Sequence, residues 1–429
     1  MDAKRISRVT LVLIVLIFLL ALFLRLLAFR EFKDHMRLQY DPRNYWYMSH
    51  QIADDGIYGY YYYDDAGNTI GGEPGESNAR VMPGYPVFLA VVYKILGDKY
   101  LQITAVRLLQ VLANSLSCVL AFYFVRKVFK KDSVALLTAL FMAVYPTYIF
   151  SCIQLLTEPL ALFTFLLYLC VEVNAILSGK AWLNILAGLC FGAHILVRPA
   201  ILPLFVLPFI FAVITNKINR GSKQNRLGFK AVSRCFVLQL IGFVAIMLPW
   251  WIRNIVTLGE IILTADTSGN PFLGGTYPYF KDYFADVPDE IRGVNNKQME
   301  LGIKRFFEGF KTEPWLYFRW YTVGKTAHIF STPYLLKMHA QTQEIHSAIH
   351  WSVLILGIPG IILHSITKIS GFWFYLYGLG ILALQLMFVP DPRFAYLMIF
   401  FLMTGASQLI VSVFEMMTRK HKKRVEALP

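Results

Sequence analysis

The stretch LVLIVLIFLLALFLRLLAF, residues 11–29, establishes the fold class of this chain. A run of about 20 apolar residues is the length needed to cross roughly 30 Å of hydrocarbon. Lys4, Arg5 and Arg8 precede the run, and no small-residue cleavage pattern follows it. We therefore expect residues 1–29 to form an uncleaved first membrane span rather than a signal peptide.

The rest of the chain repeats this pattern. Of its 429 residues, 56% are apolar and 16% are charged, whereas soluble globular proteins average roughly 45–50% and 25%. Nine further apolar runs are candidate spans, at 101–125, 133–151, 157–177, 182–197, 199–215, 235–251, 348–367, 371–389 and 394–415. The sequence therefore predicts an all-α polytopic membrane protein with about ten transmembrane helices.

The formal charge of +14 indicates topology rather than binding to nucleic acid. Lys and Arg residues lie beside the apolar runs, above all in 126–131, in 216–234 and in the tail 416–429. Loops rich in Lys and Arg stay on the cytoplasmic side of a membrane. By contrast, 21 of the 27 Asp and Glu residues fall in segments that this orientation places outside. We expect a multi-pass protein of the cell membrane with its active site on the extracytoplasmic side, surrounded by membrane lipids and without a nucleic-acid partner.

Two of the predicted extracytoplasmic loops are long, at 30–100 and 252–347. Loops of this length are usually functional rather than connective. Six spans lie between them in 101–251, and three more follow in 348–415 before the basic cytoplasmic tail.

Each long loop contains predicted structure of its own. Residues 82–97 are apolar but too short to span a membrane, which predicts an interfacial helix. The second loop has a turn-prone, Gly-rich stretch at 264–280, followed by predicted helices near 297–310 and 313–329.

Ionisable residues gather at the predicted outer ends of the spans and in the adjacent loops. They are Arg80, Glu158, His194, Arg198, Arg253, Lys325 and Arg393. Ionisable groups at membrane depth are costly and commonly functional, and a set of cations at one surface favours anion binding. Two alternatives stay open: the cations could snorkel to the interface, and Glu158 could be a first-turn acid favoured by the helix dipole.

The segment YDPRNY, residues 40–45, is the strongest local signal and follows the first span closely. A carboxylate at the membrane surface beside cations can act as a general base, which is the role we expect for Asp41. The alternative is helix capping, with Asp41 as the N-cap and Pro42 at the first position of a helix that runs to about Asp54.

Several motifs in order along the chain resemble one family of membrane enzymes. They are Asp41 with Tyr45, MPGYP at 82–86, Glu158-Pro159, Arg198, PWWIRN at 249–254 and TSGNPFLGG at 267–275. This pattern resembles the C-type glycosyltransferases that use lipid-phosphate sugars, in particular the branch of the protein O-mannosyltransferases and the aminoarabinose transferase that modifies lipid A.

The resemblance implies a transferase that takes a sugar from a polyprenyl-phosphate donor, with Asp41 as catalytic base. The expected ligands of the donor phosphate are Arg198, Arg393, Lys325, Arg80 and Arg43, and the expected supporting or acceptor-site residues are Glu158, Tyr45, His194 and Arg253. Two positions depart from the family. Pro42 stands where the mannosyltransferases have a second acid, which argues against assigning a protein acceptor. Met82 aligns with a lysine of the aminoarabinose transferase, which leaves Arg80 or Arg43 to supply that cation.

The chemistry of such a transfer fits these residues. Phosphate leaves as a stable anion, so it needs cationic donors such as Arg198 rather than a general acid. The acceptor hydroxyl is a poor nucleophile and needs a base, and a single displacement inverts the anomeric centre. The sequence has no Asp-x-Asp motif and no dinucleotide-binding glycine pattern, so we expect no metal and no other cofactor.

The acceptor stays open between a lipid, a glycan and a protein. The main alternative function is that of another C-type enzyme, such as a glycan polymerase or ligase. A flippase or transporter of lipid-linked sugars is a second alternative. It predicts charges near mid-span and repeated halves, whereas these charges lie at one face and no repeat is visible.

Overall fold

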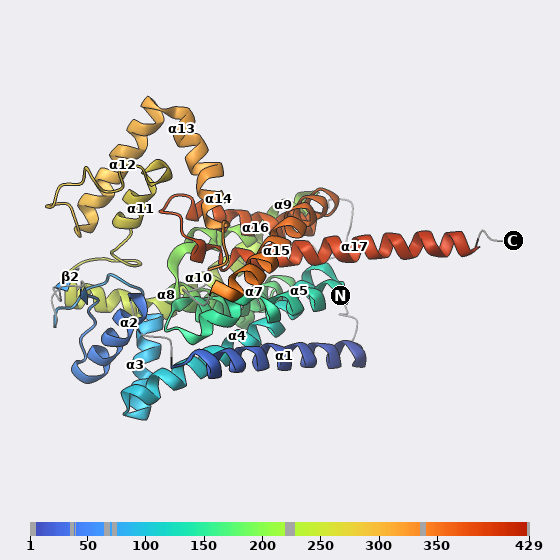
Figure 1. Ribbon diagram of the computed structural model, residues 1–429, viewed down its shortest axis with the longest axis horizontal. Coiled ribbons are helices and arrows are strands. Elements are labelled where there is room, and N and C mark those ends of the chain that lie inside the picture. The colour runs from blue at the N-terminus through green and yellow to red at the C-terminus, as the bar shows by residue number, and fades with distance from the viewer. Residues whose placement is uncertain are drawn as a thin grey trace.

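The computed structural model describes residues 6–34, 38, 40–63, 69–70, 75–218, 228–334 and 340–426. These residues form a helical bundle (Figure 1), which confirms the predicted all-α membrane fold. The described strands are two short ones, β1 (Tyr62–Tyr63) and β2 (Thr69–Ile70), which pair antiparallel in the first long loop.

Six described helices are long and apolar enough to cross a membrane. They are α1 (Arg8–Phe32), α4 (Lys99–Phe129), α7 (Thr157–Ser178), α10 (Phe229–Leu258), α15 (Ala340–Thr367) and α17 (Met398–Glu426). Each of them contains, or largely contains, one of the predicted spans.

The other four predicted spans are shorter or broken helices. The run 133–151 is a pair bent by 58°, because Pro146 cannot continue the hydrogen bonding of the helix before it. This pair consists of α5 (Asp132–Val144) and of α6 (Pro146–Phe150) with the 3₁₀ turn η2 (Ser151–Ile153). The remaining three are α8 (Ala181–Val197), the 3₁₀ helix η3 (Pro199–Val206) with α9 (Leu207–Ile218), and α16 (Ile369–Gln385). Among the described residues, six or seven elements are therefore long and apolar enough for a complete span, whereas the sequence predicts about ten.

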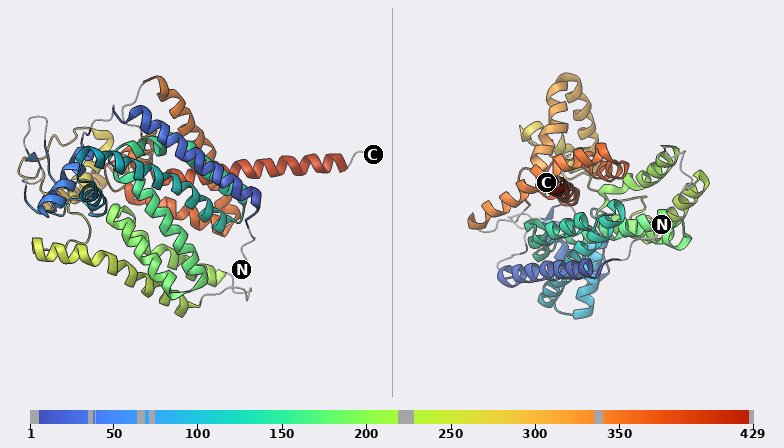
Figure 2. Two further views of the ribbon diagram at one scale, coloured as in Figure 1. Left: turned by 90° about the horizontal axis from the view of Figure 1, so that it is seen from below. Right: turned by 90° about the vertical axis from the view of Figure 1, so that its right-hand side faces the viewer.

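The elements of both long loops lie at one end of the bundle, and the start of α1 and the end of α17 lie toward the other (Figures 1 and 2). The predicted topology requires this arrangement, since it places 30–100 and 252–347 on the same side. Of the basic residues behind that prediction, Lys4, Arg5 and those in 219–227 lie outside the described residues, as does the end of the tail, 427–429.

The first long loop contains the helices that its sequence predicts. Helix α2 (Asp41–His50) continues into a π-helical turn, η1 (Gln51–Asp55), and ends at Gly56, whose φ of 70° suits a residue without a side chain. The apolar segment after Met82 forms α3 (Gly84–Leu96), which at 13 residues is too short to span.

The second long loop is also helical. Its elements are α11 (Gly269–Gly275), the 3₁₀ turn η4 (Pro278–Phe280), α12 (Asn295–Thr312), α13 (Pro314–Arg319), the π turn η5 (Trp320–Gly324) and α14 (Lys325–Ile329). Helices α12 to α14 confirm the two predicted helices. The Gly-rich stretch differs from its prediction, because part of it folds as α11 rather than as a continuous turn.

Small residues let the spanning helices approach closely. A Cβ atom at Gly360 of α15 would lie 2.0 Å from the carbonyl oxygen of Gly405 in α17. A Cβ atom at Gly188 of α8 would lie 1.9 Å from the carbonyl oxygen of Gln239 in α10. Close backbone approach of this kind is a usual packing mode of membrane helices, and it fixes the helix ends that carry the candidate site.

Candidate active site

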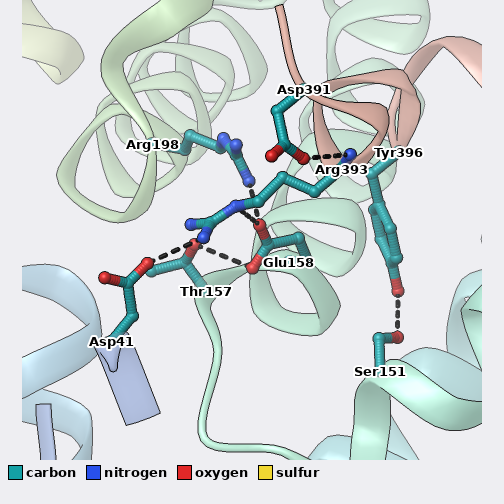
Figure 3. Close-up of polar contacts among 8 residues, drawn as sticks. All are labelled: Asp41, Ser151, Thr157, Glu158, Arg198, Asp391, Arg393 and Tyr396. Atoms are coloured by element: carbon teal, nitrogen blue, oxygen red, sulfur yellow. Dashed lines mark hydrogen bonds and ion pairs between the residues drawn. The ribbon is translucent and has the colours of Figure 1, made fainter. Parts of the chain in front are cut away.

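Four charged side chains from four parts of the chain form one connected group, shown in Figure 3. Arg393 donates from Nη1 to Oδ2 of Asp41 at 2.7 Å, and its Nε lies 2.9 Å from Oε1 of Glu158. Arg198 donates from Nη1 to the same Glu158 oxygen at 2.8 Å. We call Asp41, Glu158, Arg198 and Arg393 the charged cluster.

Local sequence places each member of the cluster at the end of an element. Glu158 is the second residue of α7 and is followed by Pro159. Arg198 has an extended backbone between α8 and η3, as expected for a residue before proline. Arg393 lies in the 3₁₀ turn η6 (Pro392–Ala395), where the Asp391 side chain accepts from the Arg393 backbone N–H at 2.8 Å.

The structure does not place Asp41 at the N-cap of a helix, as the capping alternative predicts. Tyr40, not Asp41, is the N-cap of α2, and Asp41 is the first helical residue. Tyr40 has φ of 53°, which is unfavourable for a residue with a side chain and is often found next to functional sites. The Asp41 carboxylate pairs with Arg393 instead of capping the helix. The alternative prediction of Asp41 as the N-cap is wrong by one residue.

The cluster is partly withdrawn from solvent. The side chain of Glu158 is 0% exposed, and those of Arg198 and Arg393 are 15% and 22% exposed. A buried carboxylate is tolerated only when cations and hydrogen bonds compensate the lost hydration. Burial lowers the pKa of Arg393, but the carboxylates of Glu158 and Asp41 outweigh burial and raise that pKa above its usual value, so Arg393 stays charged.

Tyr45 lies one helical turn after Asp41 and is buried against Tyr85, with ring centroids 5.2 Å apart. Burial and the negative charge of Asp41 raise the pKa of the Tyr45 phenol. The phenol therefore stays neutral at physiological pH, and it fits a supporting role better than that of a base.

A buried polar network lies behind the cluster, and the sequence motifs do not predict it. Arg25, fully buried in α1, donates to Asn114 at 3.0 Å, and Asn114 donates to the hydroxyl of Tyr396 at 2.8 Å. The same hydroxyl lies 2.8 Å from Ser151 (Figure 3). Arg25 could have been found, because a charge inside an apolar run is itself a functional signal.

A small cavity adjoins the arginines of the cluster. It is lined in part by His194, Arg198, Gln385 and Arg393, and its volume is about 10 Å³. His194 is buried, and its Nδ1 lies 3.1 Å from both Thr164 and the Ala161 carbonyl oxygen, while its Nε2 has no hydrogen-bond partner among the described residues. This volume holds about one water molecule.

Arg253 and Lys325 lie outside the cluster. Arg253 donates to the carbonyl oxygens of Asn78 and Tyr58 at 2.9 and 2.7 Å, and so ties the first loop to α10. Lys325 is fully buried and donates to the carbonyl oxygen of Leu386 at 2.7 Å. Burial lowers the pKa of Lys325 to about 6. A largely neutral amine bound in this way does not favour the predicted role as a phosphate ligand.

The last two predicted cations lie in the first loop. Arg43 is in α2, two residues after Asp41. Arg80 is half-buried where the two long loops meet, since Thr267 donates to its carbonyl oxygen at 2.6 Å. Ion pairs thus join four of the predicted site residues, namely the members of the charged cluster. Across the described part of the chain, no group of three or more His, Cys, Asp and Glu side chains could hold a metal ion.

The middle of the chain is similar to a known protein family. Residues 80–258 match the family described as dolichyl-phosphate-mannose-protein mannosyltransferase. The matched part contains Glu158, Arg198 and Arg253, whereas Asp41 precedes it and Arg393 follows it. None of the curated proteins has a sequence that matches this chain.

The fold is similar to that of solved oligosaccharyltransferases. The structure of the archaeal oligosaccharyltransferase AglB from Archaeoglobus fulgidus, in complex with an inhibitory peptide and a dolichol-phosphate, has a TM-score of 0.58 at 14% identity and covers 98% of this chain. The apo form of the Archaeoglobus fulgidus oligosaccharyltransferase has a TM-score of 0.60 at 14% identity and covers all of it. The alignments take in 52% and 53% of those proteins, so this chain spans about half their length. Residues 80–258 thus resemble a mannosyltransferase family, and the chain as a whole shares the fold of the solved oligosaccharyltransferases.

Proposed function

We propose that this chain transfers a sugar from a polyprenyl-phosphate donor to an acceptor hydroxyl, with inversion at the anomeric carbon and without a metal ion. The observation that carries the proposal is the charged cluster, because it places a carboxylate beside two guanidinium groups at the loop end of the bundle. The family match and the dolichol-phosphate bound to the archaeal oligosaccharyltransferase support a lipid-phosphate donor.

The two arginines suit the leaving group. When the bond between the anomeric carbon and the phosphate oxygen breaks, its electron pair stays on that oxygen and adds negative charge to the phosphate. Guanidinium groups bind phosphate in a geometrically specific way and stabilise this growing charge. Arg198 and Arg393 share one Glu158 oxygen, so their guanidinium groups already converge on the same acceptor.

Asp41 suits the base. The acceptor oxygen forms the new bond to the anomeric carbon, and its proton passes to the Asp41 carboxylate, so one bond forms while one breaks. A base must lie within hydrogen-bond reach of the proton that it takes. Asp41 is 34% exposed, in contrast to Glu158, and an acceptor can reach it from the loop side.

Donor binding at Arg393 would rearrange the cluster, because the Nη1 group of Arg393 already donates to Asp41. A donor phosphate that binds Arg393 competes with Asp41 for the same Nη1 group. The exchange would release Asp41 from its ion pair at the moment when a base is needed. Glu158 would keep its ion pairs with Arg198 and Arg393 and so hold both guanidinium groups in place.

The site belongs on the extracytoplasmic side under this proposal. The two long loops, which hold most of the Asp and Glu residues, lie at the cluster end, and the basic tail lies at the other end. Lipid-linked donors diffuse laterally to a site at the membrane surface, which removes the need for a nucleotide sugar. The acceptor is a glycolipid, a cell-surface glycan or a protein.

The test compares Asp41→Asn with Asp55→Asn in cells that lack the native chain. Asp55 lies in the same loop and is exposed, which makes it a matched control. Mass analysis of lipid-linked sugars and surface glycans should show loss of the product with Asp41→Asn and full rescue with Asp55→Asn. An amide cannot take up the proton at neutral pH. Full rescue by Asp41→Asn at equal protein level would refute the assignment of the base.

A further inference from the structure

The opposite end of the bundle carries a second polar cleft, and it is larger than the cavity at the charged cluster. Its volume is about 180 Å³, far more than the roughly 10–15 Å³ that one water needs. It is lined by Lys131, Gly360, Leu363, His364, Thr367, Lys368, Gln408, Leu409 and Ser412. These residues come from the end of α15, the middle of α17 and the residues just before α5 and α16.

The cleft lies at the end of the bundle where the chain begins. Asp132, which starts α5, accepts from the hydroxyl of Thr10 near the start of α1 at 3.0 Å. Figure 1 and the left view of Figure 2 place this end away from α2, α3 and α11. The cleft is therefore separate from Asp41 and Arg393, at the other membrane surface.

The lining offers hydrogen-bond donors and positive charge. Lys368 is exposed and is the N-cap of α16, where the unpaired backbone N–H groups and the helix dipole also favour an anion. Lys131 binds both oxygens of Glu415 at 2.9 Å, so one of the two lysines is already neutralised by an acid. The second lysine, Lys368, therefore gives the edge of the cleft a net positive charge.

Two buried polar groups of the cleft lack partners. Gln408 is 2% exposed and His364 is 8% exposed, and within the described part of the chain neither Gln408 Nε2 nor His364 Nε2 has a hydrogen-bond partner. The His364 ring is fixed between Phe129, with ring centroids 5.0 Å apart, and Gly371, where a Cβ atom would lie 2.4 Å from the ring. Unsatisfied buried polar groups are costly, so an occupant that accepts hydrogen bonds would stabilise this arrangement.

Apolar side chains beside the cleft are exposed in the isolated chain. They are Ile362, Leu363, Ile366, Val413, Met416 and Met417, with exposures from 41% to 77%. In a membrane this surface faces acyl chains. A cationic pocket between membrane helices with an apolar approach is the usual form of a lipid headgroup site.

We propose that this cleft binds the phosphate of an anionic phospholipid in the leaflet opposite the active site, with Lys368, Gln408 and His364 as its donors and the acyl chains along α15 and α17. A soluble phosphate has the same headgroup chemistry but makes no use of the exposed apolar side chains. The inference is independent of the proposed transfer reaction.

The test measures lipid retained by the purified full-length chain. Protein in detergent is equilibrated with equal amounts of phosphatidylglycerol and phosphatidylcholine, and bound lipid is counted by native mass spectrometry. We expect phosphatidylglycerol to be retained preferentially, and Lys368→Gln to weaken that retention roughly five-fold, the usual effect of one lysine at an anionic surface. The matched control is Lys180→Gln, because Lys180 is also exposed and is the N-cap of another bundle helix, α8.

A second variant keeps the test informative if Lys368→Gln does not fold. Gln408→Leu removes a buried amide nitrogen that lacks a partner among the described residues, so it should fold at least as well as the wild type and still lose phosphatidylglycerol. Equal retention by wild type and both variants would overturn the proposal, as would equal retention of the two lipids. Displacement of the lipid by inorganic phosphate alone would identify a soluble anion instead and overturn the lipid assignment.

Discussion

Replacing Arg393 by lysine tests the central contact of the charged cluster. Arg393 reaches two carboxylates on different elements, with Nη1 2.7 Å from Asp41 and Nε 2.9 Å from Glu158. Lysine keeps the positive charge but has one terminal ammonium group in place of the guanidinium fork. We expect the variant to keep one of these contacts and lose the other.

The structure sets the size of the effect. A hydrogen bond to a charged group contributes about 1.5–3 kcal/mol. If the lost bond acts on the phosphate in the transition state, kcat/KM should fall roughly 10- to 100-fold, since about 1.4 kcal/mol corresponds to ten-fold. Glu158 keeps Arg198 at 2.8 Å, so the free energy of unfolding should fall by less than the roughly 3–5 kcal/mol lost when a buried charge has no partner.

The assay is the initial rate of sugar transfer from the lipid donor by purified protein, together with thermal unfolding. The control is Arg292→Lys, which changes an exposed arginine of the second loop whose ion pair with Asp289 spans 3.5 Å. The control should match the wild type in both measurements. A folded Arg393→Lys enzyme with wild-type kcat/KM would refute the idea that this fork is part of the catalytic machinery.

Three further predictions test other parts of the structure. Arg198→Lys should lose most activity and Arg198→Ala more, and added magnesium should restore neither; wild-type turnover of the lysine variant would show that a bidentate grip is not needed. In intact cells, an impermeant thiol reagent should label Asn296→Cys in the second loop but not a cysteine placed in 416–419, and the reverse pattern would invert the topology. Because burial lowers the pKa of Lys325 to about 6, the unfolded chain holds a proton that the folded chain lacks from about pH 6 to about pH 10. The free energy of unfolding should therefore rise with pH across this range, and Lys325→Met should flatten the rise; an unchanged slope would mean that Lys325 is charged in the folded protein.

Much of the fold follows from the sequence because the bilayer imposes strong local rules. A run of apolar residues must be helical to satisfy its own backbone in hydrocarbon, so residues 11–29 and the later runs predict helices without knowledge of their neighbours. The same rules identified α3 as too short to span. They overestimated the number of complete spans, because a bend at Pro146 and the 3₁₀ start of the run at Pro199 depend on local geometry as well as on hydropathy.

The sequence predicts the individual residues of the candidate site but not the contacts between them. Asp41, Glu158, Arg198 and Arg393 each have an adjacent proline, and all of them except Asp41 lie near the end of an apolar run. That Asp41 contacts Arg393, which is 352 positions away, depends on how α2 and η6 are packed by the intervening helices. Sequence periodicity contains no information about such a contact.

The tertiary structure also separated cations that look alike in the sequence. Arg253 lies at the end of an apolar run as Arg198 does, and Lys325 lies in the second long loop, yet both bind main-chain carbonyl groups and join the loops to the bundle. Apolar runs and the placement of charge were enough to establish an all-α membrane protein with ionisable groups concentrated at its helix ends. Which of those groups meet was settled by the packing of the helices, because an ion pair between distant segments forms where the folded backbone brings two side chains within a few ångströms of each other.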